Sequence, residues 1–272
     1  MEFVKMQGIG NDYVYVDCFD QQVPEPERTS VYISSRRFGI GSDGLVLISP
    51  SESADCRMNI YNADGSQALM CGNGIRCVGK YAYDHGLIPS DRRTMTVETL
   101  SGIKKLDFTV EGGKARQFTV DMGRGELTSG LPESIEAAGR ALEFVGISVG
   151  NPHAVLFAPD VDAVELGEIG PALELHKRFA PYRVNAEFVQ VIDRANLKMR
   201  VWERGSGETW ACGTGATASA LASILMGYAD DQVTVKLRGG SLTISLCRET
   251  GHLFMTGPAE EVFCGSIVLP WE

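Results

Sequence analysis

Two short segments carry residues able to do chemistry, and they are near copies of each other. Residues 71–74, Cys-Gly-Asn-Gly, return 141 positions later as residues 212–215, Cys-Gly-Thr-Gly. A glycine-lined turn that enters a helix leaves backbone N–H groups unpaired, and together with the helix dipole these attract an anion such as a carboxylate. The same positive end stabilises a thiolate, so we expect each cysteine to have a pKa below its usual value of about 8.5.

Two such thiols from related halves suggest a thiolate base paired with a thiol acid. When both act on one stereocentre, the first removes its hydrogen and the second returns a proton to the opposite face, so the configuration is inverted. The carbanionic transition state needs strong stabilisation, which helix N-termini aimed at a carboxylate supply. We therefore expect Cys71 and Cys212 to be an acid/base pair.

Other readings of the cysteines remain open. A single Cys-Gly-x-Gly is typical of a buried structural cysteine whose glycines serve tight packing, but its duplication favours a functional role. A non-catalytic thiol protein, either a redox switch that forms a Cys71–Cys212 disulfide or a small-ligand binder, is the opposing class. The other five cysteines are expected to be structural: Cys18, Cys56, Cys77, Cys247 and Cys264.

The elements that position the two thiols repeat with them. Helices are expected over residues 73–85 and 214–226, each capped at its end by a glycine, Gly86 or Gly227. Further helices are expected over residues 27–38 and 161–179, and hairpin turns at residues 110–114 and 238–241. Many strand-like runs with one central helix per half predict an α+β fold of two pseudo-symmetric domains. Each domain would be a curved β-sheet or barrel around its helix, and the polar residues 123–139 would form the crossing.

Composition excludes several classes of function. The 272 residues carry a net charge of −10, which argues against nucleic-acid binding. Neither a signal peptide nor an apolar stretch of about 20 residues is evident, so no membrane association is expected. The seven cysteines lack the spacing of a disulfide framework or a zinc site, and with no export signal they predict a cytoplasmic protein with reduced thiols and no metal.

Motifs along the whole chain resemble the diaminopimelate epimerase family, and they occur in the order that the family has. The segments that carry the resemblance are Gly8–Asp12, Asn62–Ser66, Met70–Cys77, Gly150–His153, Arg183–Ala186, Val201–Thr209 and Ala211–Gly215.

The resemblance implies a cofactor-independent epimerisation of LL- to meso-diaminopimelate, on the route to lysine and peptidoglycan. It implies two barrel-like domains with the small-molecule substrate between them. The first would comprise residues 1–117 with a C-terminal strand, 262–272, that rejoins it, and the second residues 118–261. Family members are commonly homodimers.

The resemblance also assigns the remaining site residues. Glu203 would bind the substrate ammonium and His153 would tune the protonation of a cysteine. The guanidinium of Arg204 suits the distal carboxylate. The helix N-termini would hold the reacting carboxylate through Gly72, Asn73, Gly213 and Thr214, and four amides would bind the distal end, those of Asn11, Asn62, Asn151 and Asn185.

The chain departs from the family pattern at Gly44, where many members have a glutamine that can touch the substrate. The pattern Gly-Ile-Gly-Ser-Asp-Gly at residues 39–44 also fits a dinucleotide-binding motif, but no strand–helix–strand context surrounds it. A racemase of another amino acid, such as histidine or proline, or a lanthionine epimerase, would use the same thiol pair. Arg204 and the four asparagines favour a substrate with a distal carboxylate.

Overall fold

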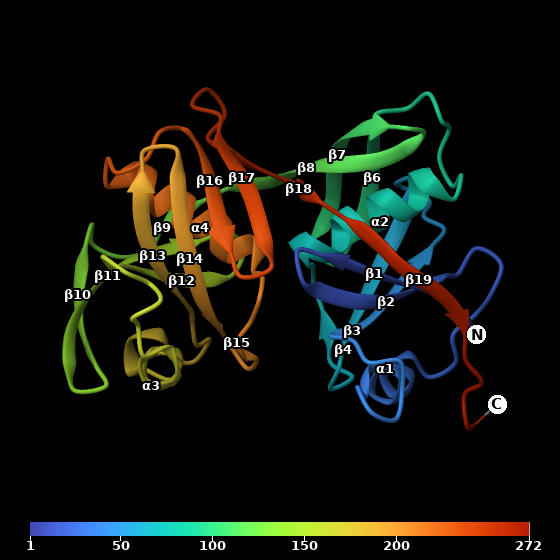
Figure 1. Ribbon diagram of the computed structural model, residues 1–272, viewed down its shortest axis with the longest axis horizontal. Coiled ribbons are helices and arrows are strands. Elements are labelled where there is room, and N and C mark those ends of the chain that lie inside the picture. The colour runs from blue at the N-terminus through green and yellow to red at the C-terminus, as the bar shows by residue number, and fades with distance from the viewer. Residues whose placement is uncertain (272) are drawn as a thin grey trace. The chain divides into compact units, whose positions relative to one another are not determined.

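The structure, a computed structural model, describes residues 1–271 and divides into two compact units. Unit 1 comprises Met1–Val120 and the final residues from Gly257, and unit 2 comprises Asp121–Thr256. The chain leaves unit 1 within strand β8 (Lys114–Arg124) and returns to it within strand β18 (His252–Pro258) (Figure 1). These crossings lie close to the boundaries expected at 117 and 262, and the first lies in a strand instead of the polar segment 123–139.

Unit 1 is a mixed sheet with two helices, α1 (Pro26–Ser34) and α2 (Gly72–Asp84). Its strands pair in the order β19-β1-β2-β3-β4-β6-β7-β8, and β5 adds to β4. The pairs β2–β3 and β4–β6 are parallel and the others antiparallel. The strands other than β8 are β1 Glu2–Gly8, β2 Asn11–Asp17, β3 Gly44–Ser49, β4 Cys56–Asn62, β5 Gln67–Ala68, β6 Thr94–Thr99, β7 Gly102–Glu111 and β19 Glu260–Ser266.

Unit 2 repeats this arrangement. Its strands pair in the order β10-β11-β12-β13-β14-β16-β17-β18, with β9 beside β11 and β15 beside β14, and the parallel pairs are β12–β13 and β14–β16. Strands β11 to β18 therefore match β1 to β8, which confirms two pseudo-symmetric domains. The strands are β9 Glu126–Leu127, β10 Glu133–Ala137, β11 Arg140–Ser148, β12 Pro152–Phe157, β13 Asn185–Asp193, β14 Asn196–Glu203, β15 Gly207–Glu208, β16 Gln232–Leu237 and β17 Gly240–Leu246.

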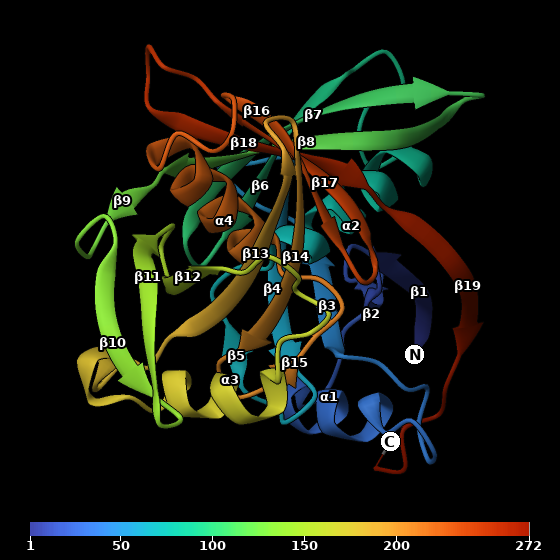
Figure 2. The same ribbon diagram turned by 60° about the vertical axis from the view of Figure 1, so that its left-hand side comes forward.

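Each unit wraps its sheet around one buried helix. In unit 2 this is α4 (Gly213–Leu225), which packs against β11, β12, β13, β14, β16 and β17 (Figure 2). Most α4 residues are small and nearly all are buried, so the helix is apolar on every side, as expected of a helix enclosed by a sheet. Helix α2 holds the same place in unit 1 and contacts β1, β2 and β19.

Helix α2 differs from α4 in burying charged side chains. Arg76 is fully buried and donates to the backbone oxygens of Gly72 and Pro258, both at 3.0 Å. Lys80 donates to Asp84 Oδ2 and to the oxygen of Ala115, both at 2.9 Å. Because these buried donors have acceptors, the charges are accommodated inside the unit.

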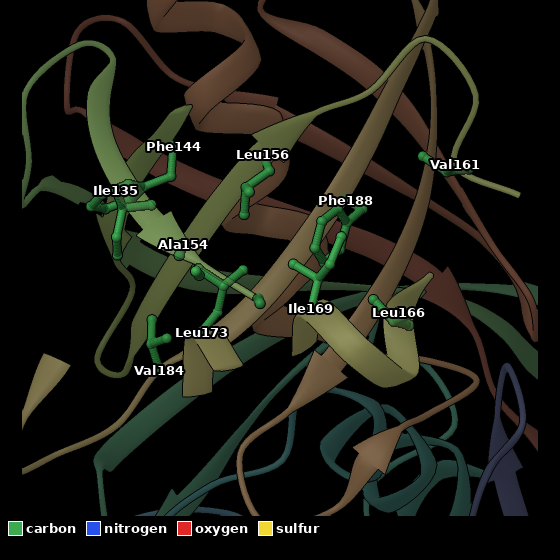
Figure 3. Close-up of a cluster of buried hydrophobic side chains, with 12 residues drawn as sticks. Ile135, Phe144, Ala154, Leu156, Val161, Leu166, Ile169, Leu173, Val184 and Phe188 are labelled. Carbon is green, nitrogen blue, oxygen red and sulfur yellow. The ribbon is translucent and has the colours of Figure 1, made fainter. Parts of the chain in front are cut away.

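A cluster of buried apolar side chains in unit 2 lies under α3 (Leu166–Glu174), as Figure 3 shows. Leu166, Ile169 and Leu173 project from the helix onto Phe188 and its neighbours. The helix expected over residues 161–179 is thus wrong in length, and a separate 3-10 turn, Lys177–Phe179, follows it. The N-terminal shortening has a local cause, because Asp160 Oδ1 accepts from the Asp162 N–H at 3.0 Å and favours a turn over a helix.

Candidate active site

Cys71 lies at the N-cap of α2, as the sequence predicts. Its backbone is extended, with φ of −133°, and its Sγ accepts a hydrogen bond from the Gly74 N–H at 3.3 Å. A side chain that accepts from the third residue of a helix satisfies one of the unpaired donors at the helix start. The sulfur therefore sits directly at the positive end of the buried helix.

Cys212 takes the same position at the N-cap of α4. Its φ is −127°, and its Sγ accepts from the Gly215 N–H at 3.3 Å. The two Cys-Gly-x-Gly segments are therefore copies in backbone geometry as well as in sequence.

Cys71 is half-buried, and its thiol faces one side-chain amide. The thiol donates to Asn11 Oδ1 at 3.3 Å, and Asn11 Nδ2 donates to Asp43 Oδ2 at 2.9 Å. A carboxylate oxygen only accepts, so Asp43 fixes the amide with its NH₂ group turned away from the sulfur. Asn11 is thereby held as an acceptor for the Cys71 S–H.

Asp43 belongs to a charged cluster at the start of β2 and β3. Arg36 Nη2 lies 3.0 Å from Asp12 Oδ1 and 3.1 Å from Asp43 Oδ1, and Lys5 pairs with Asp12. Burial raises the pKa of Asp43 and the charge of Asp12 adds to this, while hydrogen bonds from Asn11 and the Asp12 N–H oppose it. Asp43 was not predicted as a site residue, although it lies in the Gly-Ile-Gly-Ser-Asp-Gly segment of residues 39–44.

Cys212 is buried, and acidic side chains surround it. Burial raises its pKa well above the ordinary value, and the charges of Glu203 and Glu187 raise it further. Hydrogen bonds from Thr214 and the Gly215 N–H act in the opposite direction. The expected lowering of this pKa is therefore wrong within unit 2, because desolvation and two carboxylates outweigh one helix N-terminus.

Glu203 lies at the end of β14 and bonds to the hydroxyl of Thr209. Burial raises the pKa of Glu203, and Glu187 contributes in the same direction. Hydrogen bonds to Thr209 and Cys212 and the charge of His153 lower it. The structure thus places Glu203, the residue expected to bind the substrate ammonium, next to the Cys212 thiol.

A chain of hydrogen bonds approaches Cys212 from β12. His153 Nε2 lies 3.0 Å from Asn151 Oδ1, Asn151 Nδ2 donates to Thr214 Oγ1 at 3.3 Å, and Thr214 Oγ1 lies 3.5 Å from Cys212 Sγ. At its far end, His153 Nδ1 lies 2.7 Å from Glu187 Oε1. Glu187 was not predicted as a site residue, and the signal for it was an acidic residue within the otherwise apolar stretch 186–189.

Asn185 and Arg204 form a separate pair in unit 2. Asn185 Oδ1 accepts from the Arg204 backbone N–H at 2.8 Å, and Arg204 Nη1 donates to the Tyr182 oxygen at 2.6 Å. Arg204 borders a cavity of about 520 Å³ within unit 2, whose lining also includes Asn151, His153, Arg178, Tyr182 and Arg183. Of the predicted residues of unit 2, Asn151, His153 and Thr214 lie on the chain that reaches Cys212, and Arg204 borders this cavity.

Unit 1 brings fewer of its predicted residues together. Asn62 Nδ2 donates to Ser66 Oγ at 3.0 Å within its own turn, and Asn73 is buried in the first turn of α2. Gly44 has no room for a side chain, because a Cβ there would lie 2.2 Å from the Tyr61 oxygen. A glutamine therefore does not fit at position 44 unless the backbone moves.

Residues 1–271 contain neither a membrane-spanning helix nor a cluster of side chains suited to a metal ion. No helix there is long and apolar enough to cross a membrane. No group of three or more His, Cys, Asp or Glu side chains in that part of the chain is placed to hold a metal ion.

The fold is shared with solved structures of distant sequence. A hydroxyproline epimerase from Agrobacterium vitis matches with a TM-score of 0.71 at 15% identity, over 97% of this chain and 91% of that one. A phenazine biosynthesis protein from Bacillus anthracis matches with a TM-score of 0.76 at 16% identity, over 99% of both chains. At this identity the likeness shows the fold alone, which defines a class that includes racemases and epimerases.

Closer relatives define the family. The family model for diaminopimelate epimerase matches residues 3–128 and 145–262. Proteins named diaminopimelate epimerase are 53% identical in Agathobacter rectalis, over 98% of this chain and 99% of the relative, and 51% identical in Acetivibrio thermocellus, over 99% of both. The chain belongs to the diaminopimelate epimerase family.

Proposed function

We propose that this protein converts LL-diaminopimelate to meso-diaminopimelate, for lysine and peptidoglycan synthesis, with Cys71 and Cys212 as its two bases and without a cofactor. The relatives' name supports the substrate. The observation that carries the mechanism is the matched placement of the two sulfurs, each at the N-cap of the buried helix of its unit.

The proposed reaction balances its protons through the two thiols. A thiolate removes the α-hydrogen and becomes a thiol, while the other thiol protonates the opposite face and becomes a thiolate. The backbone N–H groups at Gly72, Asn73, Gly213 and Thr214 would hold the reacting carboxylate and stabilise charge that develops next to it. The enzyme is left ready for the reverse reaction, so both isomers are substrates.

The environment of Cys212 gives substrate binding a role in setting its proton affinity. In the free protein the charge of Glu203 helps to raise the pKa of Cys212. A substrate ammonium bound to Glu203 would cancel that charge and lower the thiol's pKa. His153 would act on the same thiol through its bond to Asn151.

The distal end of the substrate would be bound by neutral amides and one guanidinium. Arg204 borders a cavity in unit 2 large enough for an amino-acid group, and Asn151 also lines it. Asn11, Asn62 and Asn185 would complete the contacts on the strength of the family resemblance. Gly44 supplies no side-chain contact, so the distal end would be held by fewer groups than in members with glutamine.

Other amino acids are the second candidate substrates. A racemase of histidine or proline would need the same two thiols but not the distal carboxylate partner Arg204. A lanthionine epimerase would need both, because lanthionine also carries a distal carboxylate. On the basis of the family resemblance, we also propose that the protein is a homodimer and that it is cytoplasmic.

Deuterium incorporation tests the proposed function. The reduced protein incubated in D₂O with LL-diaminopimelate should yield the meso form with deuterium at one α-carbon, detected by mass spectrometry and NMR. Lanthionine, histidine and proline should show far slower exchange under the same conditions. Absence of exchange with diaminopimelate would refute the enzyme assignment, and faster exchange with another amino acid would reassign the substrate.

A further inference from the structure

Glu187 is a buried acid with no role so far in the proposed reaction. Its side chain and that of its partner His153 are both fully buried, and no hydrogen-bond partner is found for Glu187 Oε2 within residues 1–271. A buried carboxylate oxygen without a partner is destabilising, so packing alone does not explain the residue. In the repeat, 141 positions earlier, the matching residue is the apolar Val46.

The first turn of α4 is shaped to admit this carboxylate. A Cβ added at Gly215 would lie 2.7 Å from Glu187 Oε1 and 3.1 Å from Cys212 Sγ. Only a residue without a side chain leaves space for both groups at that point. Glu187 therefore lies directly against the helix start that carries the thiol.

The donors and acceptors in the chain from Glu187 to Thr214 are fixed by the chemistry of its side chains. An amide oxygen only accepts, so His153 Nε2 donates its proton to Asn151 Oδ1. The distance of 2.7 Å between His153 Nδ1 and Glu187 Oε1 requires a second proton between those two atoms. The ring then has no acceptor to offer, and Asn151 must turn its NH₂ group toward Thr214.

We propose that Glu187 is a positioning residue for Cys212, and that through His153 and Asn151 it directs the hydroxyl hydrogen of Thr214 toward the sulfur. Without the acid, the ring needs only one proton and a reversed network becomes equally consistent. In that network Asn151 donates to Nε2 and accepts from Thr214, so the hydroxyl hydrogen points away from Cys212. The acid selects between the two networks.

The effect on turnover rests on the proposed role of Cys212, but the hydrogen-bond relay is measurable without substrate. In ¹⁵N-labelled protein, His153 should show protons associated with both ring nitrogens, with its signals assigned by their loss in His153→Gln. In Glu187→Gln, which keeps the side-chain volume, one of the two should be lost. Unchanged ring signals in that variant would overturn the proposal, whether or not the protein epimerises diaminopimelate.

A double-mutant cycle tests whether Glu187 acts through Thr214. Glu187→Gln and Thr214→Val should each lower kcat about tenfold with a smaller change in KM, and the double variant should also be lowered only about tenfold, because residues acting in one chain are not additive. A fall of about a hundredfold in the double variant would contradict the relay. Asp84→Asn, which removes a buried carboxylate of unit 1, is the control and should lower Tm while kcat stays unchanged.

Discussion

The two thiol sites have one backbone and two different environments. Cys71 and Cys212 occupy the same N-cap position and accept from equivalent glycine N–H groups at 3.3 Å. Cys71 is half-buried and faces the amide oxygen of Asn11, while Cys212 is buried beside two carboxylates. The repeat therefore supplies the position of each sulfur, and the side chains around it set how firmly each holds its proton.

The supporting acids also differ between the units. In unit 1, Asp43 is one asparagine away from the sulfur, because Asn11 bonds to both. In unit 2, the path from Glu187 runs through three side chains. Each thiol thus has an asparagine nearby, but the two amides are oriented oppositely. Asn11 turns its oxygen toward Cys71, while Asn151 turns its NH₂ group toward Thr214, the neighbour of Cys212.

Removing either thiol should cause the largest loss of activity, and it tests whether both sites are needed. Cys71→Ala and Cys212→Ala should each lower kcat by about a thousandfold or more, since each removes one proton carrier. The measurement is the rate of LL-to-meso conversion with folded protein verified by circular dichroism. Full activity in either variant would refute the two-base assignment.

Alkylation measures the difference between the two thiols directly. With iodoacetamide at neutral pH, Cys212 should react about tenfold or more slowly than Cys71, because it is buried and its raised pKa keeps it protonated. Cys247, whose pKa is lowered mainly by its bond to Thr250, should react readily and serves as an internal reference. Peptide mapping by mass spectrometry gives each rate, and equal rates for Cys71 and Cys212 would remove the asymmetry.

The matched glycines of the two helices give a smaller test. Gly215→Ala should lower kcat about tenfold, because the new methyl group would meet the Glu187 carboxylate and the Cys212 sulfur. Gly74→Ala should have a weaker effect, since its closest neighbour, at 2.9 Å, is the flexible end of the Met58 side chain. The comparison is made on kcat of the two purified variants. A larger loss in Gly74→Ala would show that the site in unit 1 is the more tightly packed one.

The last expected effect is on stability at high pH and not on turnover. Burial raises the pKa of Cys56 from 9.0 to about 12 and that of Cys77 from 9.0 to about 11. The unfolded chain therefore loses these protons first, so the stabilisation is complete below pH 9 and decreases as the pH rises toward 11. Tm measured from pH 8 to 11 should fall, and less steeply in Cys56→Ala. An identical slope in that variant would contradict this account.

Much of the fold could be predicted because the repeat and the glycines mark where helices begin and end and where strands turn. The helices after Cys71 and Cys212 begin within a residue of their expected starts, and Gly86 and Gly227 adopt the positive φ of helix caps, 78° and 74°. The hairpin turn at Gly112 and Gly113 is also present, between β7 and β8. These features depend on local backbone preferences, which follow directly from the residue types.

The side-chain environment was harder to predict because it depends on contacts between distant elements. Cys212 was expected to have a lowered pKa, but burial and acids from β13 and β14 raise it. Cys264, expected to be structural, is exposed on β19. Asp43 and Glu187 act through hydrogen bonds to Asn11 and His153, which are distant from them in sequence. Residue type and spacing do not say which acids a fold will gather around one atom.

Strand β19 has a consequence for how the protein is made. It pairs with β1 along Glu2 to Gln7, and the Met1 amino group donates to the Ile267 oxygen at 2.9 Å. On the ribosome, unit 2 has all its residues once Thr256 has been synthesised, but unit 1 still lacks the partner of its first strand. The half of the molecule that is translated first is therefore completed last, and until then β1 exposes an open edge that a chaperone or a neighbouring chain could bind.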